Sequence, residues 1–201
     1  MLDKSIPYFR VLMVKTDTKT YPRFDLPEGY RFSGYMPGFE NDWAKLMVEL
    51  EQKDSLEKAM QLFQNEFLPL PQLLPERCLF VLDSAGCVAA TASLWPGEHF
   101  GETLQRIHWV AASPGHQGKG FVKALMTKLL DIYNELGSDD FIYLSTKTWS
   151  YKAINIYSKF GFAPYLSPKP VNWKGDNFEA ENEQAWQLIE EKIKEYERLK
   201  S

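Results

Sequence analysis

One segment constrains the fold of this chain more than any other: an expected strand that runs through a glycine-rich turn into a long helix. Gln105–Ala112 (QRIHWVAA) has the composition of a strand, and Gln117–Leu136 repeats apolar residues on one helical face. Gly137 provides the stop signal of this helix, and Phe141–Thr146 reads as the next strand. Because parallel strands need a long crossover, we expect the two strands to be parallel neighbours joined by the helix.

The flanking segments extend this pattern. Cys78–Leu82 and Cys87–Trp95 read as a β-hairpin around a turn at Asp83–Gly86. Antiparallel strands followed by strand–helix–strand–helix predict an α/β fold with a mixed, mostly antiparallel central sheet and flanking helices. The other expected elements are strands at Tyr8–Lys15 and Tyr30–Tyr35, helices at Glu40–Gln52, Ser55–Phe67, Tyr151–Phe160 and Glu179–Leu199, and a proline-rich loop at Leu68–Pro75.

Length and charge exclude several classes of protein. The 201 residues suit one domain with a sizeable core. The formal net charge of −4 argues against nucleic acid as a partner, because phosphate binding requires a basic face. No signal peptide and no apolar run of about 18 residues is present, so we expect no membrane contact and a cytoplasmic location.

Cys78 and Cys87 both adjoin apolar runs and are expected to be buried, reduced thiols.

The turn before the long helix, Ser113–Val122 (SPGHQGKGFV), has the chemistry of an anion site. Unpaired backbone N–H groups and the helix dipole attract phosphate at a helix N-terminus, and glycines let a ligand approach the backbone closely. The turn lacks the Walker A ending, and its glycines do not match the dinucleotide pattern G-x-G-x-x-G. The alternative is a plain glycine turn that binds nothing.

Gln117–Val122 (QGKGFV) resembles the pyrophosphate loop Q/R-x-x-G-x-G/A of the GCN5-related N-acetyltransferase (GNAT) family. Gln117 and Gly120 match, whereas Val122 stands where the family has Gly or Ala. The segment Ser150–Phe162 (SYKAINIYSKFGF) is similar to the second signature, N-x-x-A-x-x-x-Y-x-x-x-G-F, with Ser150 in place of Asn. Its matching residues are Ala153, Tyr157, Gly161 and Phe162.

The resemblance implies the acyl-CoA N-acyltransferase fold, with a splayed parallel strand pair. It implies a single domain over residues 1–201, in which 1–75 supplies N-terminal strands and acceptor-side helices, 77–165 the acetyl-CoA-binding core and 179–199 a C-terminal helix. Acetyl-CoA would be the co-substrate, and no metal is implied. The residues implied in binding it are Val110, Ala112, Gln117, Gly118, Lys119, Gly120, Phe121, Val122 and Ser150.

The resemblance also assigns chemical roles. Tyr157 would be the general acid that protonates the leaving thiolate, although it also suits a core aromatic position. The backbone N–H of Val110 would be the oxyanion donor. His108, two residues earlier and expected on the same strand face, is the candidate base, with a structural histidine as the alternative. Glu102 is a weaker candidate base.

Three histidines and two cysteines show no metal-ligand spacing, and no acyl-enzyme motif is present, so direct transfer is favoured. His116 is expected to be exposed, His99 lies in a turn, and Lys119 either meets a phosphate or is solvated. The acceptor implied is a small-molecule amine or a peptide amine. Because dimers are common in the family, the resemblance also allows a homodimer.

Two other hypotheses stay open. The departures at Val122 and Ser150 suit a CoA-binding or regulatory module without turnover. An interaction domain on the same fold would use aromatic residues such as Trp149, Trp173 and Trp186, which are more often core residues.

Overall fold

The structure is a computed structural model that describes residues 2–175 and 177–199. The chain divides into two compact units. Unit 1 comprises residues 1–22, 96–107 and 137–201, and unit 2 comprises residues 23–95 and 108–136. Two strands, β4 (Val88–Gly97) and β5 (Leu104–Ala112), run from one unit into the other. The single-domain organisation expected from the sequence stays a prediction.

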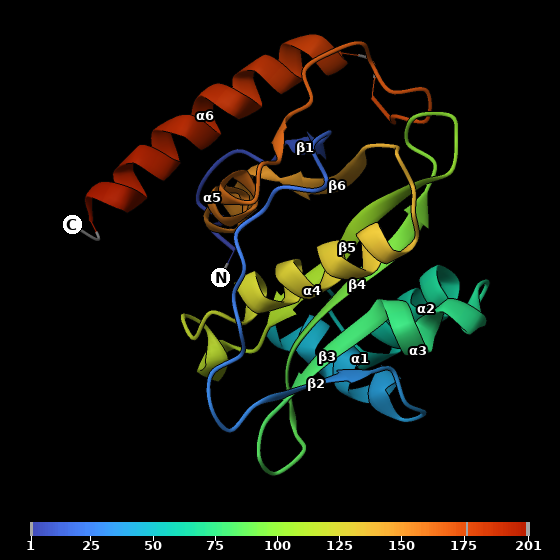
Figure 1. Ribbon diagram of the computed structural model, residues 1–201. Helices are drawn as coiled ribbons and strands as arrows, with labels where there is room; N and C mark the ends of the chain where they lie inside the picture. Colours follow the sequence, from blue (N-terminus) through green and yellow to red (C-terminus); the bar gives the residue numbers. More distant parts are fainter. Residues whose placement is uncertain (1, 176, 200–201) are drawn as a thin grey trace. The chain divides into compact units, whose positions relative to one another are not determined.

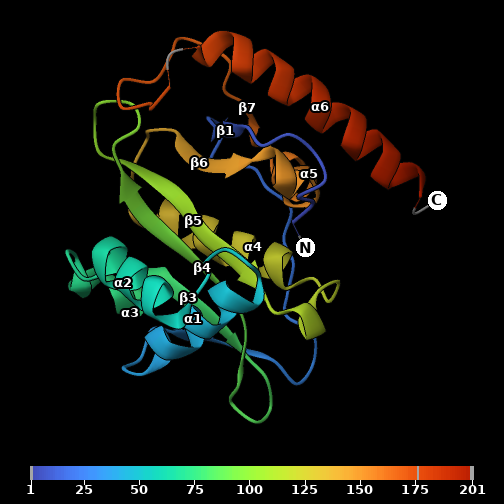
Figure 2. The ribbon, with the colours of Figure 1, turned by 180° about the vertical axis from the view of Figure 1, so that it is seen from behind.

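Unit 2 is built around antiparallel strands covered by helices on both faces. Strand β2 (Arg31–Gly34) pairs with β3 (Cys78–Leu82), which pairs with β4. The two opposite views of Figures 1 and 2 show α4 (Phe121–Glu135) on one face of these strands and α1 (Phe39–Glu49) and α2 (Leu56–Phe67) on the other. The short elements are the 3₁₀ helix η1 (Pro71–Leu73), α3 (Leu74–Arg77) and the 3₁₀ helix η2 (Pro114–His116).

Unit 1 contains the predicted parallel pair. Strand β5 pairs in parallel with β6 (Ile142–Lys147), with Arg106 opposite Tyr143 and Ile107 opposite Leu144. Strand β1 (Arg10–Lys15) pairs antiparallel with β6 and with the two-residue strand β7 (Ala163–Pro164). The helical elements of this unit are the 3₁₀ helix η3 (Thr148–Ser150), α5 (Tyr151–Lys159) and α6 (Phe178–Arg198).

The strands join one mixed sheet in the order β2-β3-β4-β5-β6-β1-β7. This confirms the expected α/β class, with mostly antiparallel pairing and one parallel pair. Strand β7 is too short to show a two-residue alternation, and it was therefore not predicted from the sequence.

Three expectations about local structure are wrong. The segment 68–75 is not a loop throughout, because Pro71 and Pro75 stand in the first turns of η1 and α3, where a missing N–H costs nothing. The long helix begins at Phe121 and not at Gln117, since Gly118 and Gly120 have φ values of 82° and 88° that a right-handed helix excludes. Cys87 is exposed in the hairpin turn, whereas Cys78 is buried as expected.

An aromatic cluster forms the core of unit 2 on the side of α1 and α2. Trp43 packs edge-on against Phe67 at 5.9 Å and against Trp109 at 5.4 Å between ring centroids. Phe67 in turn meets Trp95 at 4.9 Å. Trp43 and Phe67 are fully buried, and Trp95 is 2% exposed. Aromatic pairs of this geometry add stability beyond their buried area, so the C-terminal end of α2 is held firmly on the sheet.

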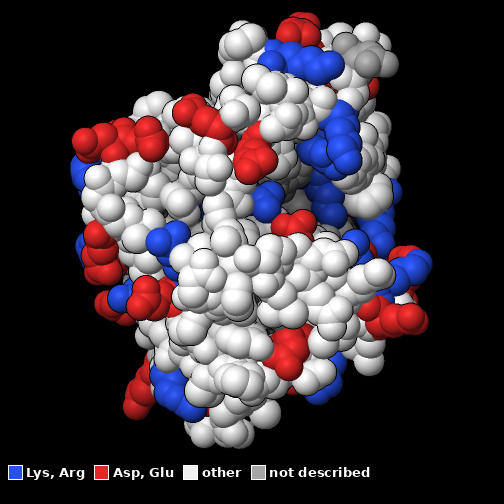
Figure 3. All heavy atoms as spheres, turned by 90° about the vertical axis from the view of Figure 1, so that its right-hand side faces the viewer, with Lys and Arg blue, Asp and Glu red and all other residues white. Residues whose placement is uncertain are grey.

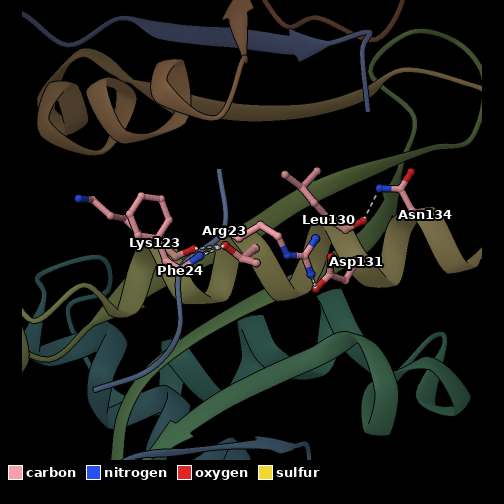
Figure 4. A network of polar contacts seen from close by, with 7 residues as sticks. Arg23, Phe24, Lys123, Leu130, Asp131 and Asn134 are labelled. Carbon is pink, nitrogen blue, oxygen red and sulfur yellow. Dashed lines mark hydrogen bonds and ion pairs between the residues drawn. The ribbon is translucent and has the colours of Figure 1, made fainter. Parts of the chain in front are cut away.

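The start of unit 2 is fastened along α4 by polar contacts (Figure 4). Arg23 forms an ion pair with Asp131 at 2.9 Å. The backbone N–H of Phe24 donates to Thr127 Oγ1 at 3.1 Å, and Lys123 Nζ lies 4.9 Å from the centroid of the Phe24 ring. The chain therefore runs against α4 before it reaches β2.

Gly34 lies where β2 passes α3 at backbone distance. A Cβ atom at this position would stand 1.8 Å from the carbonyl oxygen of Pro75, which is far inside contact distance. We predict that Gly34→Ala lowers the free energy of unfolding by about 2 kcal/mol or more, because the backbone must shift to accept the methyl group. Urea denaturation measures this change.

Gly115→Ala is the matched control, since a Cβ at Gly115 meets nothing within 4 Å. Equal urea midpoints of unfolding for Gly34→Ala and Gly115→Ala would contradict the prediction.

Candidate functional site

The second half of β5 belongs to unit 2 and contains a strained residue. Trp109 has φ 48°, a left-handed conformation that is uncommon outside glycine. This conformation interrupts the strand alternation, so the argument that His108 and Val110 share a face does not hold. Strained backbone concentrates at functional sites, where the surroundings enforce it. The indole Nε1 of Trp109 is also buried without a hydrogen-bond partner among the described residues.

His108 is paired with a carboxylate. Its Nε2 lies 2.9 Å from Glu66 Oε2, and the two side chains are 14% and 30% exposed. The ring also lies 6.1 Å from Phe67 and 5.4 Å from Trp109, measured between centroids. The histidine therefore sits between a charged group and aromatic rings, with part of its surface reachable by solvent.

The backbone of Glu66 is fixed by a separate contact. Trp95 Nε1 on β4 donates to the Glu66 carbonyl oxygen at 3.0 Å. The neighbouring Phe67 is fully buried in the aromatic cluster. The Glu66 carboxylate therefore projects from a backbone that is held in place at the last turn of α2.

The glycine-rich loop leaves open space around its backbone. Gly118 and Gly120 both have positive φ, and Gly120 is the N-cap of α4. A Cβ atom added at Gly115, Gly118 or Gly120 would meet nothing within 4 Å. The first amides of α4 have no partner inside the helix, and the dipole of a 15-residue helix favours an anion beside them. The loop therefore fits the phosphate group expected there.

Side chains around the loop hold its shape. Gln117 Nε2 donates to the carbonyl oxygen of Ala112 at 3.4 Å, which ties the loop to the end of β5. Ser113 Oγ and His116 Nδ1 lie 2.7 Å apart, and the His116 ring meets the Tyr30 ring edge-on at 5.9 Å. His116 is therefore half-buried and structural, and the expectation that it is merely exposed is wrong.

Lys119 is engaged by a tyrosine from the segment before β2. Its Nζ donates to the hydroxyl of Tyr30 at 2.9 Å and lies 5.4 Å from the ring centroid. Tyr30 also packs against Phe121 at 4.6 Å, and Phe121 is 1% exposed. Phe121 thus offers a ligand only its backbone, while Val122 is half-buried on the first turn of α4.

Tyr157 lies on α5 in unit 1 and is 6% exposed. Burial raises the pKa of its phenol well above the usual value, so the hydroxyl keeps its proton at neutral pH. Its described ring contact is with Phe162, at 6.5 Å between centroids. Ser150 occupies the N-cap position of α5, and its side chain makes no capping hydrogen bond.

The expected site residues thus fall into two groups. Unit 2 brings together His108, Val110, Ala112 and the loop residues Gln117 to Val122. Unit 1 contains Tyr157 and Ser150. Glu102 is exposed before the start of β5, at the far end of that strand from Val110, which disfavours it as the base. His99 Nδ1 lies at hydrogen-bond distance, 3.0 Å, from the hydroxyl of Tyr143.

The sequence patterns do not single out two residues that contact the expected site residues, Glu66 and Tyr30. Glu66 reads as one more polar residue of an amphipathic helix, and its pairing with His108 spans 42 positions. The sequence pattern predicts only that Tyr30 begins a strand, and it does not predict the contact with Lys119. A spacing argument along one element detects neither contact.

Three further features of the described residues bear on what the protein can bind: groups of metal ligands, membrane-spanning helices and surface charge. Within the described residues, no three His, Cys, Asp or Glu side chains are grouped as metal ligands would be. No described helix combines the length and apolar character needed to cross a membrane. On the face shown in Figure 3, acidic and basic side chains are scattered among uncharged ones.

The mixed sheet, its parallel β5–β6 pair and the glycine loop before α4 define the fold class of acyl-CoA N-acyltransferases. The sequence profile described as the Acetyltransferase (GNAT) family matches residues 39–162, more than half of the chain. The chain therefore belongs to the GNAT acetyltransferase family, which confirms the resemblance seen in the sequence. Among curated proteins, no match is found.

Solved structures share the fold at low sequence identity. The GCN5-related N-acetyltransferase from Sphaerobacter thermophilus superposes with a TM-score of 0.60 and 20% identity, covering 78% of this chain and 48% of its own. An acetyltransferase of the GNAT family from Colwellia psychrerythraea gives a TM-score of 0.59 and 11% identity, covering 79% of this chain and 54% of its own. The chain thus spans about half the length of these relatives.

The raised pKa of Tyr157 has a spectroscopic consequence. We predict that Tyr157 stays protonated at about pH 10, where a phenol in water is half ionised. The difference in absorbance at 295 nm between the wild type and Tyr157→Phe should stay near zero at this pH. A second titration in denaturant should show the missing tyrosine near the ordinary pKa.

Circular dichroism at each pH provides the control for folding. A difference signal that is already half developed at about pH 10 in the folded protein would contradict the prediction.

Proposed function

We propose that this protein is an acetyl-CoA-dependent N-acetyltransferase that transfers the acetyl group directly to a primary amine. The observation that supports this most is the open glycine loop at the N-terminus of α4 in a chain of the GNAT family. The resemblance to the family's motifs then suggests roles for the residues on β5 and α5.

On the cofactor side, we propose that the backbone amides of Gly118 to Val122 bind the pyrophosphate, because the Gln117 N–H expected to join them donates to the carbonyl oxygen of Pro114 at 3.4 Å. Gly118 and Gly120 permit this because no side chain blocks the approach and both tolerate positive φ. The interaction relies on backbone dipoles, which is consistent with the net charge of −4. The backbone of Val110 and Ala112 would pair with the pantetheine arm. Lys119 and Tyr30 would support the loop. The family resemblance also implies a hydrogen bond from acetyl-CoA to Ser150, the N-cap residue of α5.

On the chemical side, His108 accepts a proton from the acceptor ammonium, whose pKa in water is near ~10.4. The backbone N–H of Val110 stabilises the oxyanion of the tetrahedral intermediate. Tyr157 donates its proton to the sulfur as the carbon–sulfur bond breaks. Burial raises the pKa of Tyr157, so the phenol is present as a proton donor at neutral pH, and the same shift makes it a weaker acid towards the thiolate.

We predict that Tyr157→Phe lowers kcat by roughly 10²- to 10³-fold, since the variant keeps the ring and loses only the donated proton. Binding of acetyl-CoA should be unchanged, because the phenyl ring fills the same volume. Thiol release with a panel of amines measures kcat, and calorimetry measures the affinity.

Wild-type protein that binds acetyl-CoA and acetylates no amine in a broad panel would favour the non-catalytic module. Full activity of Tyr157→Phe would show that another group protonates the thiolate.

We predict that Gly120→Ala weakens acetyl-CoA binding about tenfold. Alanine in the left-handed conformation at this N-cap costs roughly 1–2 kcal/mol, so the loop relaxes away from the shape that presents its amides. Isothermal titration calorimetry gives the dissociation constants.

Gly115→Ala is again the control, because Gly115 has no positive φ and its added methyl group meets open space. Equal affinity of both variants and the wild type would place the cofactor elsewhere.

A further inference from the structure

The contact between Glu66 and His108 places a carboxylate where a helix by itself does not favour one. Glu66 lies in the last turn of α2, whose dipole leaves partial negative charge at that end, and no basic residue stands in this turn. The backbone at Glu66 is fixed there by the Trp95 indole, which donates to its carbonyl oxygen, and by the buried Phe67 beside it. Its described side-chain partner is the His108 imidazole, at 2.9 Å.

This contact sets which nitrogen of His108 has the proton. A carboxylate accepts hydrogen bonds and donates none, so the Nε2 that faces Glu66 must be the N–H of the neutral ring. The lone pair then lies on Nδ1. The same carboxylate stabilises the imidazolium that forms when Nδ1 takes up a proton. The aspartate of a Ser-His-Asp triad stabilises its histidine in the same way.

The described contacts of His108 combine this carboxylate with aromatic rings. Phe67 of α2 and the neighbouring Trp109 present rings to it. Glu66 Oε2 lies 2.9 Å from its Nε2. The strained backbone of Trp109 directly follows, and Val110 comes next with the N–H assigned to the oxyanion.

We propose that Glu66 is the positioning residue of a Glu66–His108 dyad, in which Nε2–H is held by the carboxylate and Nδ1 takes the proton from the acceptor ammonium. The inference rests on the proposed acetyl transfer. The freed amine lone pair forms the carbon–nitrogen bond, and the carbon–sulfur electron pair leaves with the sulfur. Tyr157 protonates that sulfur and regains a proton from the tetrahedral nitrogen, while the proton on His108 passes to water.

The test compares Glu66→Gln with Glu57→Gln, an exposed carboxylate at the other end of α2. Glu66→Gln keeps the size of the side chain and removes its charge. At about pH 7.5 it should lower kcat roughly 10- to 100-fold, as loss of a group that orients a functional histidine typically does. Glu57→Gln should leave kcat unchanged, and both should bind acetyl-CoA like the wild type.

Two readouts separate positioning from a structural role. Combining Glu66→Gln with His108→Gln should slow the enzyme no further than His108→Gln alone, because the dyad acts as one unit. Near pH 10 roughly a third of an acceptor amine with a pKa of ~10.4 is already neutral, compared with about one part in a thousand at pH 7.5, so the reaction depends much less on a base. The deficit of Glu66→Gln should therefore shrink several-fold between about pH 7.5 and pH 10, while Tyr157 still holds its proton.

The outcomes distinguish this inference from the proposed function. An active wild type with Glu66→Gln equal to Glu57→Gln overturns the dyad and leaves acetyl transfer standing. Additive losses in the double variant, or a deficit that is the same at both pH values, reduce Glu66 to a structural role and also overturn it. A wild type that binds acetyl-CoA but acetylates no amine overturns the proposed function and the dyad with it.

Discussion

The parallel pairing of β5 with β6 is the constraint on which the rest of the structure depends. Arg106 opposite Tyr143 and Ile107 opposite Leu144 fix two strands in the same direction, so the chain between them must return to the starting edge of the sheet. Helix α4 makes this crossover. Its N-terminus consequently follows the carboxyl end of β5 and the glycine loop, and the first amides of α4 have no partner inside the helix. The proposed anion site would thus follow from the topology before it depends on particular side chains.

Side-chain packing in unit 2 fixes the positions of individual residues around β5. The aromatic cluster around Trp43 and Phe67 fixes the end of α2, and the Trp95 indole fixes the carbonyl of Glu66. A carboxylate on a rigid turn then reaches His108 at hydrogen-bond distance. The left-handed Trp109 lies between this histidine and Val110, so the most strained backbone of β5 lies among the residues to which chemistry is assigned.

Much of this was predictable from local sequence, and the exceptions have physical reasons. The β3–β4 hairpin, the β5–β6 pair and the long helices were predictable because their apolar periodicity is strong. The sequence pattern predicts the start of α4 four residues too early, because composition does not reveal that Gly118 and Gly120 adopt positive φ. The Glu66–His108 contact joins positions 42 residues apart, and no pattern within α2 singles out Glu66. Family signatures indicated Tyr157, whereas its burial emerged only from the fold.

The discontinuous make-up of unit 1 bears on how the chain is made in the cell. Strand β1 pairs with β6 and β7, with Arg10 opposite Lys147 and Met13 opposite Pro164. During synthesis, the first strand therefore leaves the ribosome long before its partners exist. Its fully buried Val11, Leu12 and Met13 must stay in water through the translation of more than a hundred residues. In that interval the nascent chain presents an unpaired apolar strand, the kind of segment that chaperones recognise, while the β3–β4 hairpin is already complete.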